Sequence, residues 1–167
     1  MSIDNEIGKK AEEKIKEWLD HPEQNISYTR LFDQMSGYYM VSRNICDFII
    51  YEYPSIYFLE SKATWHDRFD FSMIQPHQKD GMLAKSKIKG SYGLVMVLFA
   101  TYQKAFIFNI KDIAKLEEKK QMSLNIKKQK DWNIPYCRVP TISNNRKKLL
   151  DYKGDLNKLL KESKVKH

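Results

Sequence analysis

Residues 44–64, with the sequence NICDFIIYEYPSIYFLESKAT, are the stretch from which we predict the fold of this chain. They contain two apolar segments rich in β-branched and aromatic residues, separated by a short segment of turn composition. The turn between them is centred on Tyr53 and Pro54. An antiparallel hairpin with that turn places Asp47 directly across from Glu60. The sequence therefore predicts a β-hairpin that carries two opposed carboxylates.

Ionisable residues inside apolar strands require a reason, because a buried charge is unfavourable unless it is paired or bound to a metal. Strand alternation puts Lys62 on the same face as Glu60, with Ser61 on the other face. Like charges directly opposite each other in a sheet are destabilising. A cation next to Asp47 and Glu60 would turn this repulsion into a binding site. The alternative interpretation is a structural hairpin with a Glu–Lys ion pair.

Length and charge narrow the possible classes of protein. The 167 residues suffice for one domain with a core, and 29 Lys and Arg against 21 Asp and Glu give a net charge of +8. This charge favours an anionic partner, nucleic acid first and an anionic membrane surface second. No apolar run approaches the roughly 20 residues of a membrane span, and the N-terminus lacks the pattern of a signal peptide. Cys46 and Cys137 form neither a disulfide framework nor a zinc motif, so we expect a reducing, cytoplasmic setting and no membrane association.

The rest of the chain predicts helices and strands around this hairpin. Apolar spacing of three to four residues predicts an amphipathic helix at 4–20 with Asp4 as its N-cap. A proline at the first position and Gly90 beyond the last predict a helix at 76–89, and the apolar run 93–100 is typical of a strand buried on both faces. The remaining expected elements are a strand at 26–32, a turn at 33–37, a strand at 38–41, a loop at 63–72, a strand at 104–110, a helix at 111–119 and a basic terminal helix within 144–167.

This order of elements predicts an α/β domain in which helices flank a mixed central sheet. We expect one domain over 1–167, with a core at about 4–119 and a basic C-terminal extension at 120–167.

The residues in this order resemble the PD-(D/E)XK nuclease superfamily, and within it the RecU-type and archaeal-type Holliday junction resolvases. Asp47 matches the aspartate at the start of the second strand, and Glu60-Ser-Lys62 matches the Glu-x-Lys signature of the third strand. Gly-Lys-Lys-Ala-Glu at 8–12 resembles the motif of the first helix, and His-Gln at 77–78 resembles the pair on the following helix. The resemblance implies a restriction-endonuclease-like core and a DNA endonuclease.

One departure concerns the substrate. RecU proteins carry a protruding segment between the first glutamate and the aspartate, and this segment engages the centre of the junction. Here Asp47 follows Glu12 by only 35 positions, which leaves little room for it. Three functions therefore stay open: a resolvase acting on branched DNA, a repair or restriction-type nuclease acting on flap or linear DNA, and a non-catalytic nucleic-acid-binding module. The intact Asp47, Glu60 and Lys62 argue against the third.

The resemblance also implies a metal and its ligands. Mg²⁺ is the expected ion, with Mn²⁺ as a substitute. Mg²⁺ prefers oxygen ligands and keeps several waters, and Asp47, Glu60 and the carbonyl of Ser61 are the expected ligands. Glu12 is expected to complete the set, either directly or through water.

The resemblance also implies which residues take part in catalysis and in DNA binding. Lys62 is expected to orient or activate the attacking water, and Gln78 to hold that water or the phosphate. Because a junction has two equivalent strands to cut, a homodimer with two sites is expected, with aromatic residues at 38–40, Trp65 and Trp132 as candidate contacts. The alternative is that these aromatic residues, and Trp132 in particular, fill the core of the monomer. The expected DNA-binding residues are Arg30, Arg43, Thr64, Arg68, Lys79, Lys85 and Lys87.

Overall fold

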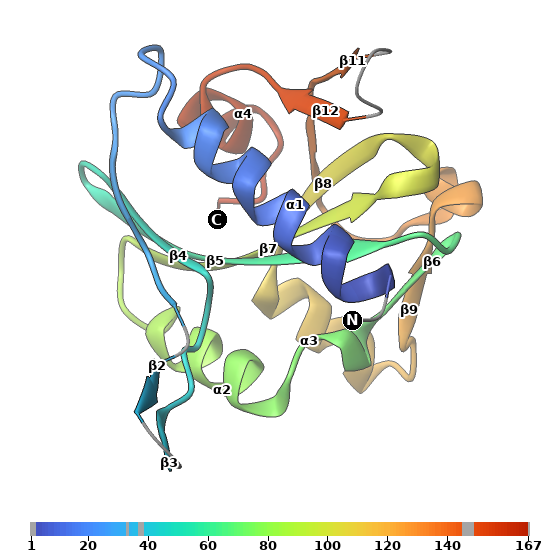
Figure 1. Ribbon diagram of the computed structural model, residues 1–167. Helices are drawn as coiled ribbons and strands as arrows, with labels where there is room; N and C mark the ends of the chain where they lie inside the picture. Colours follow the sequence, from blue (N-terminus) through green and yellow to red (C-terminus); the bar gives the residue numbers. More distant parts are fainter. Residues whose placement is uncertain (1–2, 33, 37–38, 145–148, 167) are drawn as a thin grey trace.

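The computed structural model describes residues 3–32, 34–36, 39–144 and 149–166, and Figure 1 shows its arrangement. A six-stranded sheet runs in the order β1-β4-β5-β7-β8-β10. Strands β5 and β7 are parallel, and the other neighbouring pairs are antiparallel. The prediction of an α/β fold with a mixed central sheet is therefore confirmed. The strands are β1 (Ser27–Arg30), β4 (Phe48–Glu52), β5 (Ser55–Thr64), β7 (Ser91–Phe99), β8 (Lys104–Asn109) and β10 (Cys137–Val139).

Helices cover both faces of this sheet. In Figure 1, α1 (Ile3–Leu19) and α4 (Leu156–Glu162) lie on one face, and α2 (Pro76–Lys85) and α3 (Ile110–Glu118) lie on the other. Strand β7 is buried between these layers. Its Leu94 and Met96 belong to the apolar cluster that includes α1 and α4, whereas Val95 and Val97 belong to the cluster of α2 and α3. This alternation explains the continuous apolar run and confirms the doubly buried strand.

The central hairpin has the predicted register. Phe48 pairs with Leu59, and Glu52 pairs with Ser55 at the turn. Asp47 lies one residue before β4, and its backbone N–H donates to the carbonyl of Leu59 at 3.1 Å. The two acidic positions of the hairpin are therefore brought to the same end of β4 and β5.

The first helix starts and ends one residue earlier than predicted, at Ile3 and Leu19. It begins at Ile3, so Asp4 lies inside the helix and is not its N-cap. The predicted apolar stripe is buried against the sheet as expected. It consists of Ile7, Ala11, Ile15, Trp18 and Leu19.

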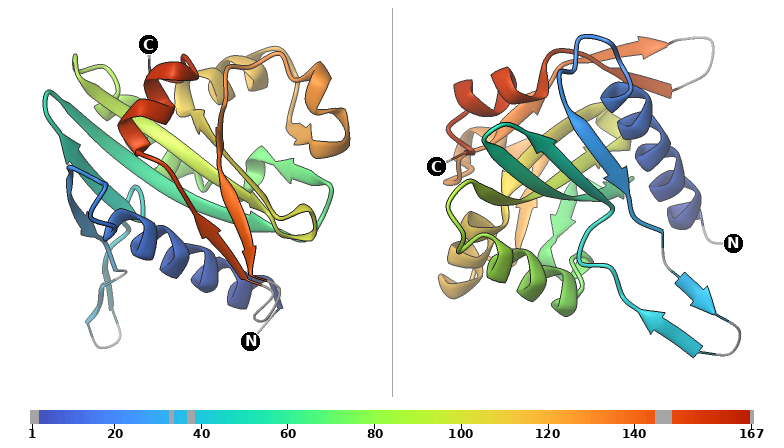
Figure 2. Two further views of the ribbon diagram at one scale, coloured as in Figure 1. Left: turned by 90° about the horizontal axis from the view of Figure 1, so that it is seen from above. Right: turned by 90° about the vertical axis from the view of Figure 1, so that its left-hand side faces the viewer.

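A small hairpin occupies the interval that we expected to be too short for a protrusion. Strands β2 (Gln34–Ser36) and β3 (Tyr39–Ser42) pair with each other and project from the body of the molecule between β1 and β4 (Figure 2). The expected turn at 33–37 is wrong, because its middle is strand β2. The strand expected at 38–41 pairs with β2 instead of joining the central sheet. Residues 33, 37 and 38 and the side chains of 33–42 lie outside the described part of the structure, and with them the aromatic stretch 38–40.

Two further regions differ from the sequence prediction. The expected loop 63–72 contains the end of β5, strand β6 (Arg68–Asp70), which pairs with β9 (Ser123–Asn125), and the first residues of the 3₁₀ helix η1 (Phe71–Met73). Helix α2 ends at Lys85, and Gly90, with φ of 81°, lies in the turn that leads to β7. The chain contains two more short 3₁₀ helices, η2 (Ala100–Tyr102) and η3 (Ile126–Asp131).

The C-terminal segment is not the expected basic helix alone. Strands β11 (Thr141–Asn144) and β12 (Leu149–Tyr152) form a hairpin. Helix α4 starts only after Gly154, with Asp155 as its N-cap. The expected extension 120–167 also contributes β10, the sixth strand of the sheet, and Leu156 and Leu160 of α4 are buried. These residues are therefore integrated with the core.

Candidate active site

Glu60 is the most deeply buried acidic residue of the central hairpin, with 2% of its side chain exposed. Its Oε1 accepts hydrogen bonds from Lys62 Nζ at 2.6 Å and from Gln78 Nε2 at 2.7 Å. Lys62 Nζ also lies 3.3 Å from Gln78 Oε1, which closes a ring of three polar side chains. Glu60 and Lys62 thus share a face of β5, as alternation predicts, and helix α2 supplies the third member.

Tight packing of α2 sets the position of Gln78. Gln78 is the N3 residue of α2, and its Oε1 accepts from the backbone N–H of Gln75 at 3.1 Å. Gly81 of the same helix has no side chain, and a Cβ there would overlap Ile45, just before Asp47 in the chain. Gly93 of β7 likewise leaves room for the helix, since a Cβ there would lie 2.8 Å from the Cβ of Met82. These two glycines let α2 approach both β7 and the segment that leads into Asp47.

The second carboxylate oxygen of Glu60 is unsatisfied. Among the described residues, Oε2 is buried and has no hydrogen-bond partner. Burial raises the pKa of Glu60 above its ordinary value, and Lys62 and Gln78 only partly offset this effect. A buried carboxylate oxygen without a partner is unfavourable, so this atom lies where a cation or a donor would be stabilising.

Asp47 shares this environment. Its Oδ2 accepts from the backbone N–H of Ser61 at 2.7 Å, which ties it to β5. Burial and then the charge of Glu60 raise the pKa of Asp47, while the Ser61 N–H acts in the opposite direction. Two carboxylates with raised pKa values at one place fit a divalent cation, because a bound cation would favour the charged form of both.

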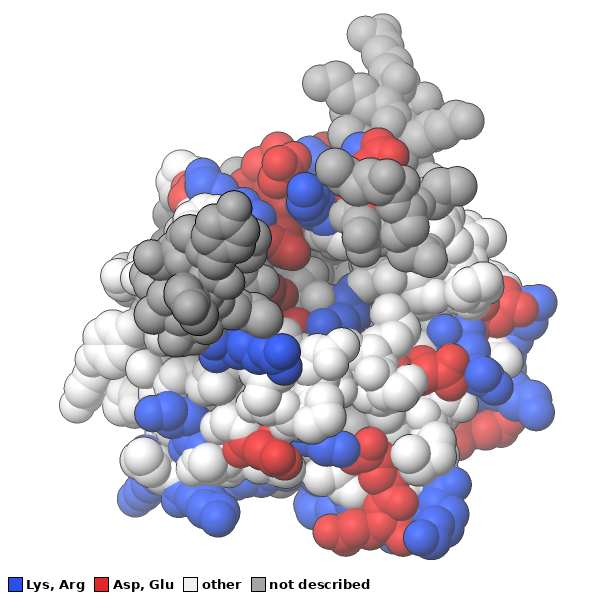
Figure 3. Space-filling model, turned by 60° about the horizontal axis from the view of Figure 1, so that its bottom comes forward, with Lys and Arg blue, Asp and Glu red and all other residues white. Residues whose placement is uncertain are grey.

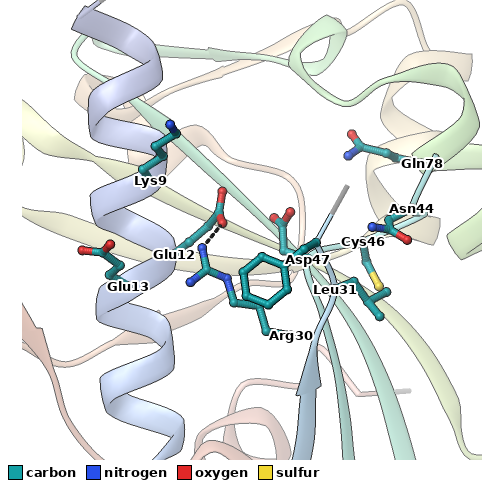
Figure 4. A pocket seen from close by; sticks show the side chains of 10 residues that line it. Lys9, Glu12, Glu13, Arg30, Leu31, Asn44, Cys46, Asp47 and Gln78 are labelled. Atoms are coloured by element: carbon teal, nitrogen blue, oxygen red, sulfur yellow. Dashed lines mark hydrogen bonds and ion pairs between the residues drawn. The ribbon is translucent and has the colours of Figure 1, made fainter. Parts of the chain in front are cut away.

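A cavity of about 290 Å³ opens beside Asp47. Figure 4 shows Asp47 and Glu12 pointing into it and Glu13 turned away, and in Figure 3 acidic and basic side chains lie together inside a hollow of this face. Burial raises the pKa of the Cys46 thiol to about 12, and this thiol donates to the backbone carbonyl of Phe48. The lining residues are Lys9, Glu12, Glu13, Arg30, Leu31, Phe32, Asn44, Cys46, Asp47 and Gln78.

Glu12 reaches the cavity from α1 but is engaged by another residue. Its Oε2 accepts from Arg30 Nη2 at 2.6 Å, and both side chains are largely buried. Within the described ranges, no three His, Cys, Asp or Glu side chains are grouped so as to hold a metal ion. The acidic residues that fit a cation directly are therefore the pair Asp47 and Glu60, with Glu12 nearby in an ion pair.

The predicted DNA contacts fall into different classes. Thr64 is 5% exposed, and its hydroxyl accepts from the backbone N–H of His66, so its burial removes it from the surface that DNA could contact. Three of the others are paired with a carboxylate, namely Arg30, Arg68 and Lys79. Arg68 is nevertheless exposed, as are the remaining three, Arg43, Lys85 and Lys87. Basic side chains in Figure 3 alternate with acidic ones instead of forming one continuous patch.

The two tryptophans expected at a dimer contact differ in their exposure. Trp132 is 9% exposed and packs against Phe99, Phe106 and Phe108 in the core. Of the two alternatives for Trp132, core packing is therefore the one observed, and its ring is not available to a dimer surface. Trp65 is 46% exposed and is available for contact.

Sequence reasoning missed Phe32. This residue lines the cavity and is 66% exposed, with the guanidinium carbon of Arg30 4.9 Å from the centre of its ring. A single Phe at the end of a short strand carries no periodic signal, so no local pattern could have identified it. The Arg30–Glu12 ion pair could not be predicted either, because it joins two residues that are 18 positions apart and lie on different elements.

The chain matches a known protein family over most of its length. The model described as RecU, Recombination protein U, matches residues 16–155 of the chain. The matched region contains Asp47, Glu60, Lys62 and Gln78 and begins after Glu12. Comparison with curated proteins gave no match. None of the helices in the described part of the chain is long and apolar enough to cross a membrane.

Proposed function

Because the chain belongs to the RecU family of Holliday junction resolvases, we propose that it is a divalent-metal-dependent endonuclease that cuts four-way DNA junctions in recombination. The observation that carries this proposal is the buried Glu60, bonded to Lys62 and Gln78 through one oxygen and left without a partner on the other. The raised pKa of the neighbouring Asp47 supports the same assignment.

Asp47 and Glu60 would hold the metal, Mg²⁺ or Mn²⁺ in its place, with the carbonyl of Ser61 as a further oxygen ligand. Bound there, the ion would polarise the scissile phosphate and lower the pKa of a water molecule. Glu12 would join this site through Oε1, the oxygen that Arg30 does not bind, or by exchanging the bond that Oε2 makes with Arg30. Two carboxylates suit Mg²⁺, which is commonly held by one or two carboxylates, with water and substrate phosphate completing its shell.

Lys62 and Gln78 would act on the reacting groups. The Lys62 ammonium lies 2.6 Å from Glu60 Oε1, so it stands at the edge of the acidic pair, where it would orient the attacking water and offset negative charge in the transition state. Gln78 would hold this water or a phosphate oxygen through its amide. Both side chains are positioned by their bonds to Glu60 and to each other, and Gln78 also accepts from the backbone N–H of Gln75.

The wider surface would bind the DNA. The net charge of +8 and the exposed Arg43, Lys85 and Lys87 supply phosphate contacts, which makes affinity sensitive to salt. The projecting β2–β3 hairpin would engage the centre of the junction, as the protruding segment of RecU proteins does. We also propose that residues 1–167 act as one nuclease domain within a homodimer, because two symmetric sites match the two equivalent strands of a junction.

The decisive experiment compares a four-way junction, a flap and a linear duplex of equal length, each with Mg²⁺ and with EDTA. We expect paired cuts in the junction with Mg²⁺ and none with EDTA. Glu60→Gln should abolish cleavage, whereas Glu118→Gln, an exposed acid at the end of α3, should leave it unchanged. Equal cutting of linear duplex would replace the resolvase by a general nuclease, and cutting in EDTA would remove the metal from the proposal.

A further inference from the structure

Phe32 is an exposed aromatic residue on the wall of the catalytic cavity. It is 66% exposed, although large apolar side chains elsewhere in the chain are mostly buried. It lies two residues after the end of β1 and two residues before the start of β2, the first strand of the projecting hairpin. Its cavity is the one that Asp47 lines.

The ring is supported from one side. The guanidinium carbon of Arg30 lies over the Phe32 ring, 4.9 Å from its centre. Arg30 is itself fixed, since Nη2 donates to Glu12 at 2.6 Å and the same guanidinium lies 5.9 Å from the ring of the fully buried Phe48. A guanidinium over a ring face is attractive. One face of Phe32 is thus held by a group anchored to the core, and among the described residues no other charged group or ring lies against it.

We propose that the other face of Phe32 is a stacking platform for a DNA base at the branch point. Every base has a flat π face, and stacking on an aromatic side chain contributes to binding without reading the sequence. In a continuous duplex both faces of a base are covered by its neighbours. In the open form of a four-way junction the stacking is interrupted at the branch point, which leaves base faces there uncovered.

This inference rests on the proposed nuclease function and names how its substrate is selected. Phosphate contacts alone bind linear and branched DNA alike, because they follow the backbone. The Phe32 platform adds a contact that only DNA with an uncovered base can make. It therefore sets the preference for branched over linear DNA, while Asp47 and Glu60 carry out the cleavage.

Photocrosslinking of the full chain tests the platform directly. A four-way junction with 5-iodouracil at the positions next to the branch point is bound in EDTA, irradiated and analysed by peptide mass spectrometry. We expect a crosslink at Phe32 with the junction and none with linear duplex carrying the same base. The variants are Phe32→Leu, Phe32→Trp and, as a matched control, Tyr53→Leu, an aromatic residue in the β4–β5 turn that is 81% exposed.

Affinities measured with the same DNAs give the second readout. Phe32→Leu should weaken junction binding by about 5- to 100-fold, the range for loss of one stacked base, and should leave duplex binding within about twofold. Phe32→Trp should restore junction binding, and Tyr53→Leu should match the wild type. A junction crosslink that avoids Phe32, or an equal loss for junction and duplex in Phe32→Leu, would overturn the platform.

Cleavage by the wild type distinguishes a failure of the stacking platform from a failure of the proposed nuclease function. If the wild type cuts junctions with Mg²⁺ and Phe32→Leu binds and discriminates normally, the platform is wrong and the nuclease stands. If the wild type neither binds nor cuts a junction, the proposed function fails, and the platform fails with it.

Discussion

Replacing Asp47 by asparagine should make the metal-free protein more stable while abolishing its cleavage activity. Asparagine has nearly the same shape as the protonated aspartic acid, and its side-chain oxygen can still accept the hydrogen bond from the Ser61 N–H, which is 2.7 Å long in the wild type. The substitution therefore removes a negative charge from a buried acidic pair and leaves the packing of the hairpin intact.

The size of the effect follows from the pKa of Asp47. An aspartate in an unfolded chain has a pKa of about 3.9, and burial, followed by the charge of Glu60, raises the pKa of Asp47 to about 7. At about 1.36 kcal/mol per unit, this difference corresponds to ~4 kcal/mol of destabilisation above pH 7. Glu60 has a raised pKa as well, and a proton on either acid relieves the same repulsion. We therefore expect Asp47→Asn to raise the free energy of unfolding by about 2–4 kcal/mol at pH 8.

The sign of the pH dependence is also determined. Since the pKa is raised in the folded state, the contribution of Asp47 to stability is fully present below about pH 4 and is lost as the pH rises through about 7. The stability gain of the variant should therefore be largest at pH 8 and shrink as the pH falls toward 4.

Urea denaturation in EDTA at several pH values measures the gain. Asp67→Asn is the matched control, because hydrogen bonds from Lys127 and then Tyr102 lower the pKa of Asp67, and its removal should not stabilise. Adding Mg²⁺ should stabilise the wild type and not Asp47→Asn. The reasoning would be refuted by a variant no more stable than the wild type at pH 8, or by an equal gain at pH 5 and pH 8.

Four other expectations concern the reaction and the assembly. Lys62→Ala should slow single-turnover cleavage by about 10²-fold or more and change junction affinity little; a lower melting temperature as the sole effect would mean a structural ion pair. Gln78→Ala should slow turnover without shifting the Mg²⁺ concentration that half-stabilises the protein, and a wild-type rate would remove it from the site. Arg30→Gln should lower that Mg²⁺ midpoint, because it frees the acidic Glu12, and an unchanged midpoint would separate Glu12 from the metal. Sedimentation at micromolar concentration should give a homodimer that nicks a cruciform plasmid on both strands, and a monomer releasing singly nicked plasmid would contradict the paired sites.

The central hairpin could be predicted from the sequence because its geometry is local. The position of its turn determines the pairing of β4 with β5, and strand alternation determines which side chains share a face. Asp47, Glu60 and Lys62 were therefore placed together correctly from residue types and spacing alone. Strand β7, which is buried on both faces, could also be predicted from the sequence, because a central strand with apolar neighbours on both faces needs an uninterrupted apolar run.

Contacts between separate elements were decided only by the tertiary structure. The bond from Gln78 to Glu60 requires α2 to pack closely on the sheet, and Gly81 and Gly93 reveal that approach only when their neighbours are known. Strands β2 and β3 pair with each other and project, although their composition does not distinguish this from membership of the main sheet.

The Arg30–Glu12 ion pair is likewise a contact between separate elements that only the tertiary structure decides. A charged side chain on a helix can face solvent, DNA or another element, and its own sequence neighbourhood does not distinguish these outcomes. Packing of α1 beside β1 brings the two side chains to 2.6 Å, which turns an expected DNA contact into an internal ion pair and leaves Phe32 supported at the mouth of the cavity. Periodicity and turn chemistry act over a few residues and so are encoded locally, whereas the partner of a long charged side chain depends on how whole elements pack.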